Sequence, residues 1–253
     1  MKLPILMLMV FVTLASIANT AQAFQVYDLG TIAGFPDFAE NENTPTWGDD
    51  NRLGDGATIS YSFAESTYSC DATSSCFSLS DFMPAGYQDT IALAFDAWAS
   101  VSNLSFSIAT DQSGDIVLGG ETMDGSSGQL GHARINVQYF SDGVETTSFI
   151  SSGAVHFDRD EPWSLSGSDT PLYDVALHEI GHALGLDHSD DSSALMYYIY
   201  TGTNTLQVDD IAGIQYLYGA SVSPVPEPSI YLMFLLGLAM VAGYGRRAVF
   251  FQK

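Results

Sequence analysis

Three histidines and one glutamate lie within eleven residues, at spacings that suit a divalent metal ion. His178 and His182 are four residues apart, so in a helix they share one face and their ring nitrogens converge. Gly185 follows three residues later, where glycine can adopt the left-handed conformation, end the helix and bring His188 round as a third ligand. Three histidines leave the fourth tetrahedral position of zinc open to water, which is typical of a catalytic site. Glu179 lies beside that face and can act as a general base.

The chemistry that this set suits is hydrolysis of a peptide bond. Zinc lowers the pKa of a bound water to about 7 and stabilises the oxyanion that forms. Glu179 can take the proton of that water and carry it to the leaving amine. The alternative is a surface coincidence, which would be the better interpretation of a bare pair of histidines four residues apart. Five fixed residues at fixed offsets, with a helix-stopping glycine between the ligands, favour the metal site.

These residues resemble the signature of the metzincin metallopeptidases, HExxHxxGxxH followed by a methionine turn. Ser189, after the third histidine, is the residue that marks the matrixins among them, and Ala194–Tyr197 resembles their Met-turn, with Met196 beneath the zinc. Tyr198 stands where matrixins usually have proline, which puts the shape of the substrate pocket wall in question. Tyr200 is expected to be the retained wall residue of that pocket.

The resemblance covers about residues 55–219, within an expected catalytic domain of residues 55–222. It implies an α+β zincin (metzincin) fold: a twisted, mostly parallel five-stranded sheet with three main helices and the active site in a cleft along the sheet edge. The residues themselves predict a first strand from alternation and helices from apolar spacing and terminal signals. The predicted strands are residues 57–63, 104–106 and 115–118, and the predicted helices are residues 89–102, 171–184 and 208–218. Residues 168–170 offer side chains that could cap the middle helix.

Two further segments, residues 119–131 and 156–163, resemble the matrixin segments that bind structural ions. By position in that resemblance, Asp124, Asp158 and Glu161 match calcium-ligating carboxylates, with carbonyl groups of the glycine-rich loop completing an oxygen cage. The alternative is an acidic, solvated loop.

His132 and His156 match two ligands of a second, structural zinc in the same family. Val117 and Gly119 stand where the other histidine and the aspartate are expected, and Glu121 is a candidate substitute ligand. The interpretations are therefore a structural zinc or two ordinary hydrogen-bonded histidines. The gap between the two histidines is longer than in most matrixins, which indicates an insertion around residues 139–152.

Cys70 and Cys76 are the only cysteines and lie close together in a Ser-, Thr- and Asp-rich loop. An even, close pair in an exported protein predicts a disulfide, and a cysteine metal site would need a second pair. Matrixin propeptides often carry a cysteine that occupies the zinc. Residues 24–54, a polar segment without periodicity, contain none, so latency by that route is not expected.

Both ends of the chain resemble targeting signals. Residues 1–23 have a short apolar run and a small-x-small cleavage site, which predict a secretory signal peptide rather than a retained anchor. Residues 223–253 combine Pro-Glu-Pro, the apolar run Ile230–Tyr244 and a basic end, and resemble a PEP-CTERM sorting tail. That resemblance implies export in a Gram-negative bacterium, transient anchoring in the inner membrane and cleavage by an exosortase-type enzyme. Permanent anchoring is the alternative.

The chain carries 30 acidic and 7 basic side chains, for a net charge of −23. All acidic residues lie between Asp28 and Glu227, which disfavours nucleic acid and anionic membranes as partners of the domain. The simplest interpretation of this charge is solubility outside the cytoplasm, and the alternatives are specific ion binding or attraction to basic substrates. The sequence therefore predicts an exported, monomeric zinc endopeptidase that cleaves protein or peptide substrates at the cell surface or in the medium. The alternative is a surface or biofilm-matrix binding protein on a metalloprotease fold, with little or no catalysis.

Overall fold

The computed structural model describes the domain that carries the histidines. The chain consists of two compact units, Met1–Ser221 and Val222–Lys253. The expected signal peptide, most of residues 24–54 and the expected sorting tail lie outside the described residues. The described residues are 24–26, 44–48, 52–65, 68–69, 75–110, 113–141, 146–166 and 169–221.

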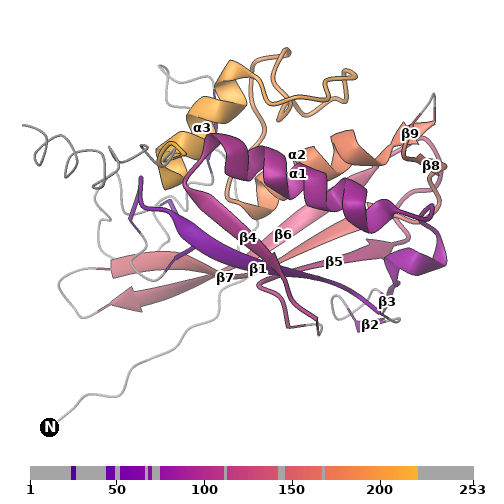
Figure 1. The fold of residues 1–253 in the computed structure, drawn as a ribbon, viewed down its shortest axis with the longest axis horizontal. Helices are drawn as coiled ribbons and strands as arrows, with labels where there is room; N and C mark the ends of the chain where they lie inside the picture. The colour runs from indigo at the N-terminus through magenta and orange to yellow at the C-terminus, as the bar shows by residue number, and fades with distance from the viewer. Residues whose placement is uncertain are drawn as a thin grey trace, which may run out of the picture. The chain divides into compact units, whose positions relative to one another are not determined.

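A five-stranded sheet in the order β4-β1-β5-β7-β6 forms the base of the domain (Figure 1). All neighbouring pairs are parallel except β6 and β7, which are antiparallel. The prediction of a mostly parallel five-stranded sheet is therefore confirmed. The strands are β1 (Ala57–Phe63), β4 (Leu104–Ile108), β5 (Ile116–Glu121), β6 (Gly131–Ser141) and β7 (Thr146–Asp158).

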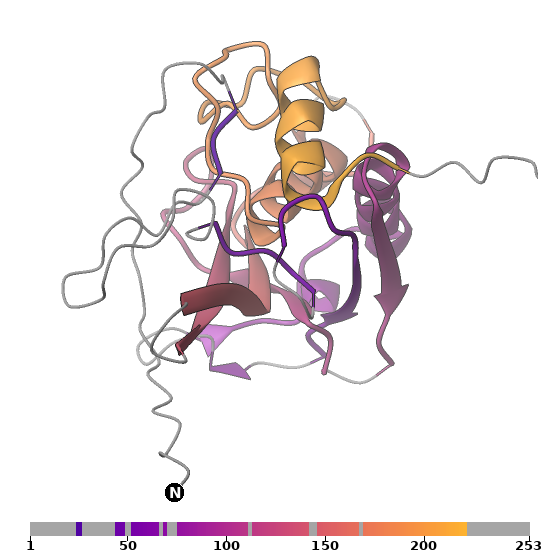
Figure 2. The ribbon, with the colours of Figure 1, turned by 90° about the vertical axis from the view of Figure 1, so that its left-hand side faces the viewer.

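Three α-helices accompany the sheet in the described residues, as the sequence predicted. They are α1 (Tyr87–Val101), α2 (Leu172–Ala183) and α3 (Val208–Tyr218). Helices α1 and α2 lie on the same face of the sheet, and the view turned by 90° places α3 on that side as well (Figures 1 and 2). The short elements are η1 (Leu79–Asp81) and the two-residue strands β2 (Tyr68–Ser69), β3 (Ser75–Cys76), β8 (Trp163–Ser164) and β9 (Thr170–Pro171).

Aromatic side chains join α1 to the sheet and to α2. Phe95 stacks on Tyr61 of β1 with ring centroids 4.1 Å apart, and both rings are buried. Trp98 is fully buried and donates its indole N–H to the Leu177 carbonyl oxygen at 2.9 Å. Burial of such rings contributes hydrophobic free energy, and the indole hydrogen bond fixes how α2 lies against α1.

Strands β6 and β7 form a long antiparallel hairpin where the sequence indicated an insertion. Their pairing runs from Gly131 with Phe157 to Ser141 with Thr146, and the register shifts between Asn136 and Val137. Most of residues 139–152, where the insertion is predicted, belong to these two paired strands. A bulge of this kind bends a strand and increases its twist.

The prediction that a side chain of residues 168–170 caps α2 is wrong. The helix begins after Pro171, and no side chain caps its N-terminus. Thr170 instead belongs to β9, which pairs with β8, and its hydroxyl donates to Glu161 Oε2 at 3.1 Å. Ser168 lies outside the described residues.

Asp210 at the start of α3 holds the turn that contains Met196. Its carboxylate accepts the backbone N–H groups of Leu195 and Met196, both at 2.9 Å. It also accepts the N–H of Gln207 at 2.7 Å, which completes a capping box. One buried carboxylate thus satisfies three donors and fixes the position of the turn relative to α3.

Replacing Asp210 with alanine leaves these three donors without their acceptor. We expect Asp210→Ala to lower the free energy of unfolding by about 3 kcal/mol or more. Denaturant titration followed by circular dichroism measures the loss. The control is Asp55→Ala. The carboxylate of Asp55 is exposed, and its ion pair with Arg52 is long at 3.9 Å, so this variant should change the free energy of unfolding by less than about 0.5 kcal/mol. Equal stability of the two variants would contradict this role of Asp210.

Candidate active site

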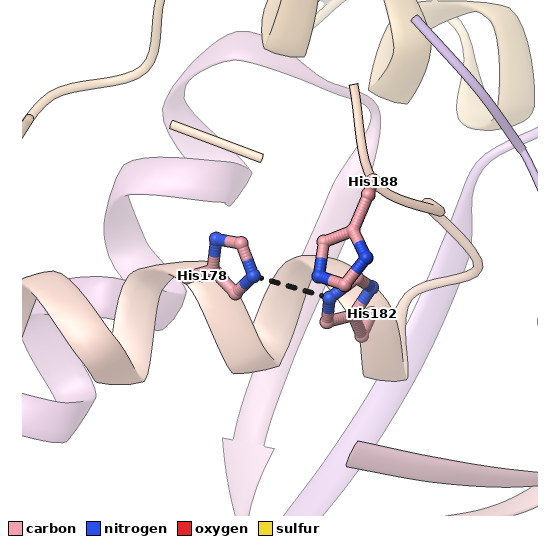
Figure 3. A group of neighbouring side chains, drawn as sticks. All are labelled: His178, His182 and His188. Carbon is pink, nitrogen blue, oxygen red and sulfur yellow. Dashed lines mark hydrogen bonds between the residues drawn. The ribbon is translucent and has the colours of Figure 1, made fainter. Parts of the chain in front are cut away.

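The structure brings the three histidines of the signature together. His178 and His182 project from α2, and His188 reaches the same point from the chain that follows the helix (Figure 3). One ring nitrogen of each histidine lies within 4.8 Å of the others, and the Nε2 atoms of His178 and His182 are 3.1 Å apart. A tetrahedral zinc with bonds of about 2.0–2.1 Å holds its ligand atoms roughly 3.3 Å apart, so the donor set fits this ion.

Backbone carbonyl groups orient two of the rings. His178 Nδ1 lies 2.8 Å from the Leu195 oxygen, and His182 Nδ1 lies 2.8 Å from the Leu186 oxygen. A carbonyl can only accept, so each Nδ1 carries the proton and each Nε2 presents a lone pair. Such outer hydrogen bonds fix the tautomer that binds a metal.

Burial keeps the ligand histidines neutral. It lowers the pKa of His178 to about 4 and that of His182 well below its usual value. The pKa of His188, the most exposed of the three rings, is also lowered, mainly by desolvation. Because a protonated imidazole cannot bind a metal, neutral rings at pH 7 are ready as ligands.

The turn after α2 depends on Gly185. Its φ of +102° lies in the left-handed region that favours glycine, as the sequence predicted. Leu186 then donates its N–H back to the Gly181 oxygen at 3.0 Å, and Asp187 donates to the Gln25 oxygen at 3.0 Å. The turn therefore directs the chain, and with it His188, back toward the exposed side of the helix.

Glu179 is buried beside the histidines. Its Oε2 atom is buried and has no hydrogen-bond partner, and burial raises the pKa of the carboxyl to about 8. A side chain at Gly131 would place its Cβ 3.1 Å from Glu179 Cγ, so the bare backbone of β6 packs directly against this residue. A buried carboxylate without a partner is costly, and a cation bound by the adjacent histidines would offset that cost.

Met196 is buried and contacts α2 between the two histidine ligands. A Cβ on Gly181 would lie 2.5 Å from Met196 Sδ. The glycine therefore provides the space that the methionine fills. The structure places this residue where a Met-turn residue of the metzincin type is expected.

A cleft of about 890 Å³ opens over the histidines. One wall contains the start of β6 around Gly131, and the other contains residues 197–201 with Thr203. Tyr198 and Tyr200 both line this cleft, and both are exposed. Tyr200 donates its hydroxyl to Asp174 Oδ2 at 2.6 Å.

Sequence reasoning missed Asp174 as a residue of the cleft. It lies on α2 four residues before His178, so the same helical spacing that revealed the histidine pair also places it on their face. Its carboxyl side chain is buried although no basic residue is near it in sequence, and burial raises its pKa.

His132, His156 and Glu121 form a second cluster on three neighbouring strands. His132 Nε2 lies 3.2 Å from His156 Nδ1 and 3.3 Å from Glu121 Oε2. Glu121 Oε2 is buried, accepts no hydrogen bond and lies 4.0 Å from His156 Nδ1. Val117 and Gly119 contribute no metal-binding side chain.

The three predicted calcium ligands surround the glycine-rich loop but do not converge as the histidines do. Glu161 Oε1 accepts the N–H of Ser127 at 2.5 Å, and Asp124 accepts that of Gln129 at 3.0 Å. Asp158 Oδ1 accepts the N–H of Asp160, while its Oδ2 is buried without a partner. Among the described residues, the clusters of three or more metal-binding side chains do not include these three carboxylates.

Cys76 is fully buried and its sulfur belongs to a disulfide. Cys70, its predicted partner, lies outside the described residues. No helix in the described part of the chain has the length and apolar character needed to cross a membrane. The expected membrane segment, residues 230–244, lies outside that part.

Comparison with known proteins gives two family matches. Residues 64–219 match the matrixin family, and residues 224–248 match the PEP-CTERM protein-sorting motif. Interstitial collagenase of Sus scrofa is 42% identical over 146 residues, which cover 54% of this chain and 29% of that protein. Macrophage metalloelastase of Oryctolagus cuniculus is 41% identical over 149 residues, covering 53% of this chain and 30% of that protein. The chain thus spans about three tenths of the length of these relatives.

The histidine cluster predicts a zinc ion that depends on all three rings. We expect His182→Ala to hold one zinc fewer per chain than the wild type after gel filtration, because two remaining ligands bind zinc weakly. Elemental analysis measures the metal content. All five histidines belong to one of the two clusters, so the control is Gln88→Ala, an exposed residue of α1. An unchanged zinc content in His182→Ala would exclude this site.

Proposed function

The chain belongs to the matrixin family, and on that premise we propose that it is a zinc-dependent endopeptidase that hydrolyses protein substrates outside the cytoplasm. The observation that carries the proposal is the convergence of His178, His182 and His188 beside the unpartnered carboxylate of Glu179. A structural metal site has no need of a buried base beside it. The activities named for the collagenase and metalloelastase relatives agree with this reaction class.

Glu179 acts as the proton carrier of the reaction. When bound, zinc supplies a Lewis acid that polarises the scissile carbonyl and lowers the pKa of a water in the cleft. Glu179 takes a proton from that water and delivers it to the leaving amine. Burial makes this carboxylate a stronger base than an exposed glutamate.

An extended substrate binds along β6. This strand is at the edge of the sheet, so the backbone groups on its outer side have no neighbouring strand in the sheet. Residues 130–133, at the start of β6, line the cleft next to the histidines. Pairing of a peptide with this edge gives affinity through backbone hydrogen bonds and leaves side chains to determine specificity.

The role of Glu179 is tested with the isosteric variant Glu179→Gln. We expect cleavage of an unfolded protein substrate to fall about 10²- to 10⁴-fold, because general base catalysis contributes that much. Zinc content and unfolding temperature should stay at wild-type values, and a chelator should abolish wild-type activity.

Glu65→Gln, an exposed glutamate outside the cleft, is the control and should retain full activity. A folded, zinc-loaded wild type that cleaves no member of a broad peptide library would contradict the proposal and favour the binding-protein alternative.

A second zinc is held by His132, His156 and Glu121. The pairing of strands β5, β7 and β6 places Gly119, His156 and His132 in one row. Because Gly119 has no side chain, Glu121, two residues further on the same face of β5, can reach the histidines. Separations of 3.2 and 3.3 Å from His132 Nε2 to the other two ligand atoms suit tetrahedral zinc. Cys76 is close, but its disulfide removes the thiolate that zinc needs.

This second site predicts two zinc ions per wild-type chain. Glu121→Gln should hold one, because the amide of glutamine is a poor zinc ligand, and it should retain peptidase activity because the catalytic histidines are unchanged. Elemental analysis and the cleavage assay together measure both effects, with Glu65→Gln as the control. A wild-type chain that contains one zinc would exclude the second site.

Calcium stabilises the loop of residues 122–130. The buried Asp158 Oδ2 has no partner, and Asp124 and Glu161 already contact the backbone of this loop. Carboxylates and loop carbonyls are the ligands that calcium prefers, and binding would draw the three side chains closer together. The bound ion compensates negative charge that no lysine or arginine in the described residues neutralises at Asp158.

The C-terminal segment directs export. Its match to the PEP-CTERM motif supports transient anchoring in the inner membrane of a Gram-negative bacterium, followed by cleavage near Pro226-Glu227-Pro228 by an exosortase-type enzyme. The mature domain then acts as a monomer at the cell surface or in the medium.

A further inference from the structure

The cleft contains one carboxylate that the proposed reaction does not use. Asp174 lies one helical turn before His178, and its Oδ2 accepts the hydroxyl of Tyr200 at 2.6 Å. No hydrogen bond from the described residues reaches its Oδ1 atom. Burial and the adjacent Asp174 raise the pKa of Tyr200 to about 12, so the phenol keeps its proton and donates it to the carboxylate.

The surroundings of Asp174 are acidic. The lining of the cleft includes four other carboxylates and no lysine or arginine. The only basic residues in the described part of the chain apart from histidine are Arg52, Arg134 and Arg159, and none of these lines the cleft. The acidic lining residues are Glu161, Asp169, Asp174, Glu179 and Asp187. Glu161 and Glu179 lie beside the proposed metal ions, so Asp169, Asp174 and Asp187 are the carboxylates of the cleft that no proposed metal ion neutralises.

The walls near Asp174 suit the stem of a long side chain. Val175, Leu195 and Ile199 line the same cleft and offer apolar contacts. Lysine and arginine bury their methylene stems against such surfaces while their charged ends reach a carboxylate. One helical turn is about 5.4 Å, so a side chain that reaches Asp174 belongs to a residue close to the bond held at the histidines.

We propose that Asp174, held by Tyr200, gives the cleft a preference for substrates with lysine or arginine next to the scissile bond. This proposal rests on the proposed peptidase function and specifies the substrate class of that peptidase. Asp174 selects the substrate by its charge and takes no part in proton transfer.

A purely structural role of the pair predicts different behaviour. If Asp174 only tied down the loop that carries Tyr200, its hydrogen bond would matter and its charge would not. Asp174→Asn removes the charge but keeps an oxygen that can accept the hydroxyl of Tyr200. Tyr200→Phe removes the hydrogen bond but keeps the charge. The two variants therefore separate electrostatic selection from support of the loop.

The test is cleavage of synthetic peptides that differ at the two residues flanking the scissile bond. Lysine, arginine, norleucine and glutamate are placed in turn on each side. We expect wild-type kcat/KM to be about 10- to 100-fold higher for lysine than for norleucine on one side of the bond, and lowest for glutamate.

Asp174→Asn should lose this preference because its rate for lysine falls to that for norleucine, and Tyr200→Phe should retain the preference. Equal wild-type rates for lysine and norleucine, or a preference that survives in Asp174→Asn, would overturn the proposal.

A binding assay measures the same preference, as a difference in peptide affinity, without turnover. Zinc-loaded Glu179→Gln protein is titrated by calorimetry with the lysine and the norleucine peptide. We expect the lysine peptide to bind at least about tenfold more tightly, with a difference that shrinks as salt rises and disappears in the Glu179→Gln/Asp174→Asn double variant. Equal affinities would refute the role of Asp174. Selective binding without any cleavage by the wild type would instead contradict only the peptidase function.

Discussion

The facing imidazole rings of His178 and His182 constrain how the rest of the domain must fold. The Nε2 atoms of His178 and His182 are 3.1 Å apart, and each ring directs its Nδ1 to a carbonyl, of Leu195 and Leu186 respectively. Two lone pairs therefore point at one place, which is unfavourable unless a cation lies between them. The first carbonyl belongs to the turn at Met196 and the second to the chain after Gly185. The site can form only when α2 and these two segments are fixed together.

Hydrogen bonds from buried aromatic side chains hold α2 in place. Trp98 donates its indole N–H to the Leu177 carbonyl, Trp47 to that of Ala183, and Tyr218 donates its hydroxyl to that of Leu184. The carbonyl groups of Ala183 and Leu184 lie at the end of the helix and have no partner within it, so the bonds from Trp47 and Tyr218 also satisfy groups that would otherwise be buried at a cost. The three donors come from α1, the N-terminal segment and α3, so three parts of the chain hold α2. Burial and hydrogen bonding thus position the helix before any metal binds.

Features that depend on local spacing were predictable from sequence, and those that depend on distant pairing were not. The strand at 57–63 and the helix at 208–218 have the predicted bounds, because side-chain alternation and helix termini act over a few residues. The cap of α2 was mispredicted because Thr170 pairs with β8 and binds Glu161, which no local pattern reveals. Glu121 could be named only as a candidate ligand, because its approach to His132 depends on the register of three strands.

The acidic composition has a structural consequence beyond solubility, because several carboxylates are buried in a domain with few basic side chains. A buried charge needs a partner, and three arginines in the described residues cannot supply one to each. Asp210 is satisfied by backbone N–H groups. The buried Oε2 atom of Glu121 lies beside two histidines and 3.9 Å from the Arg134 guanidinium, whereas that of Glu179 has no hydrogen bond. At both carboxylates we propose a metal cation as a counter-charge. Asp174 lines the open cleft, where we propose that the counter-charge arrives with the substrate. In these proposals, metal binding and substrate preference both follow from one shortage of positive charge.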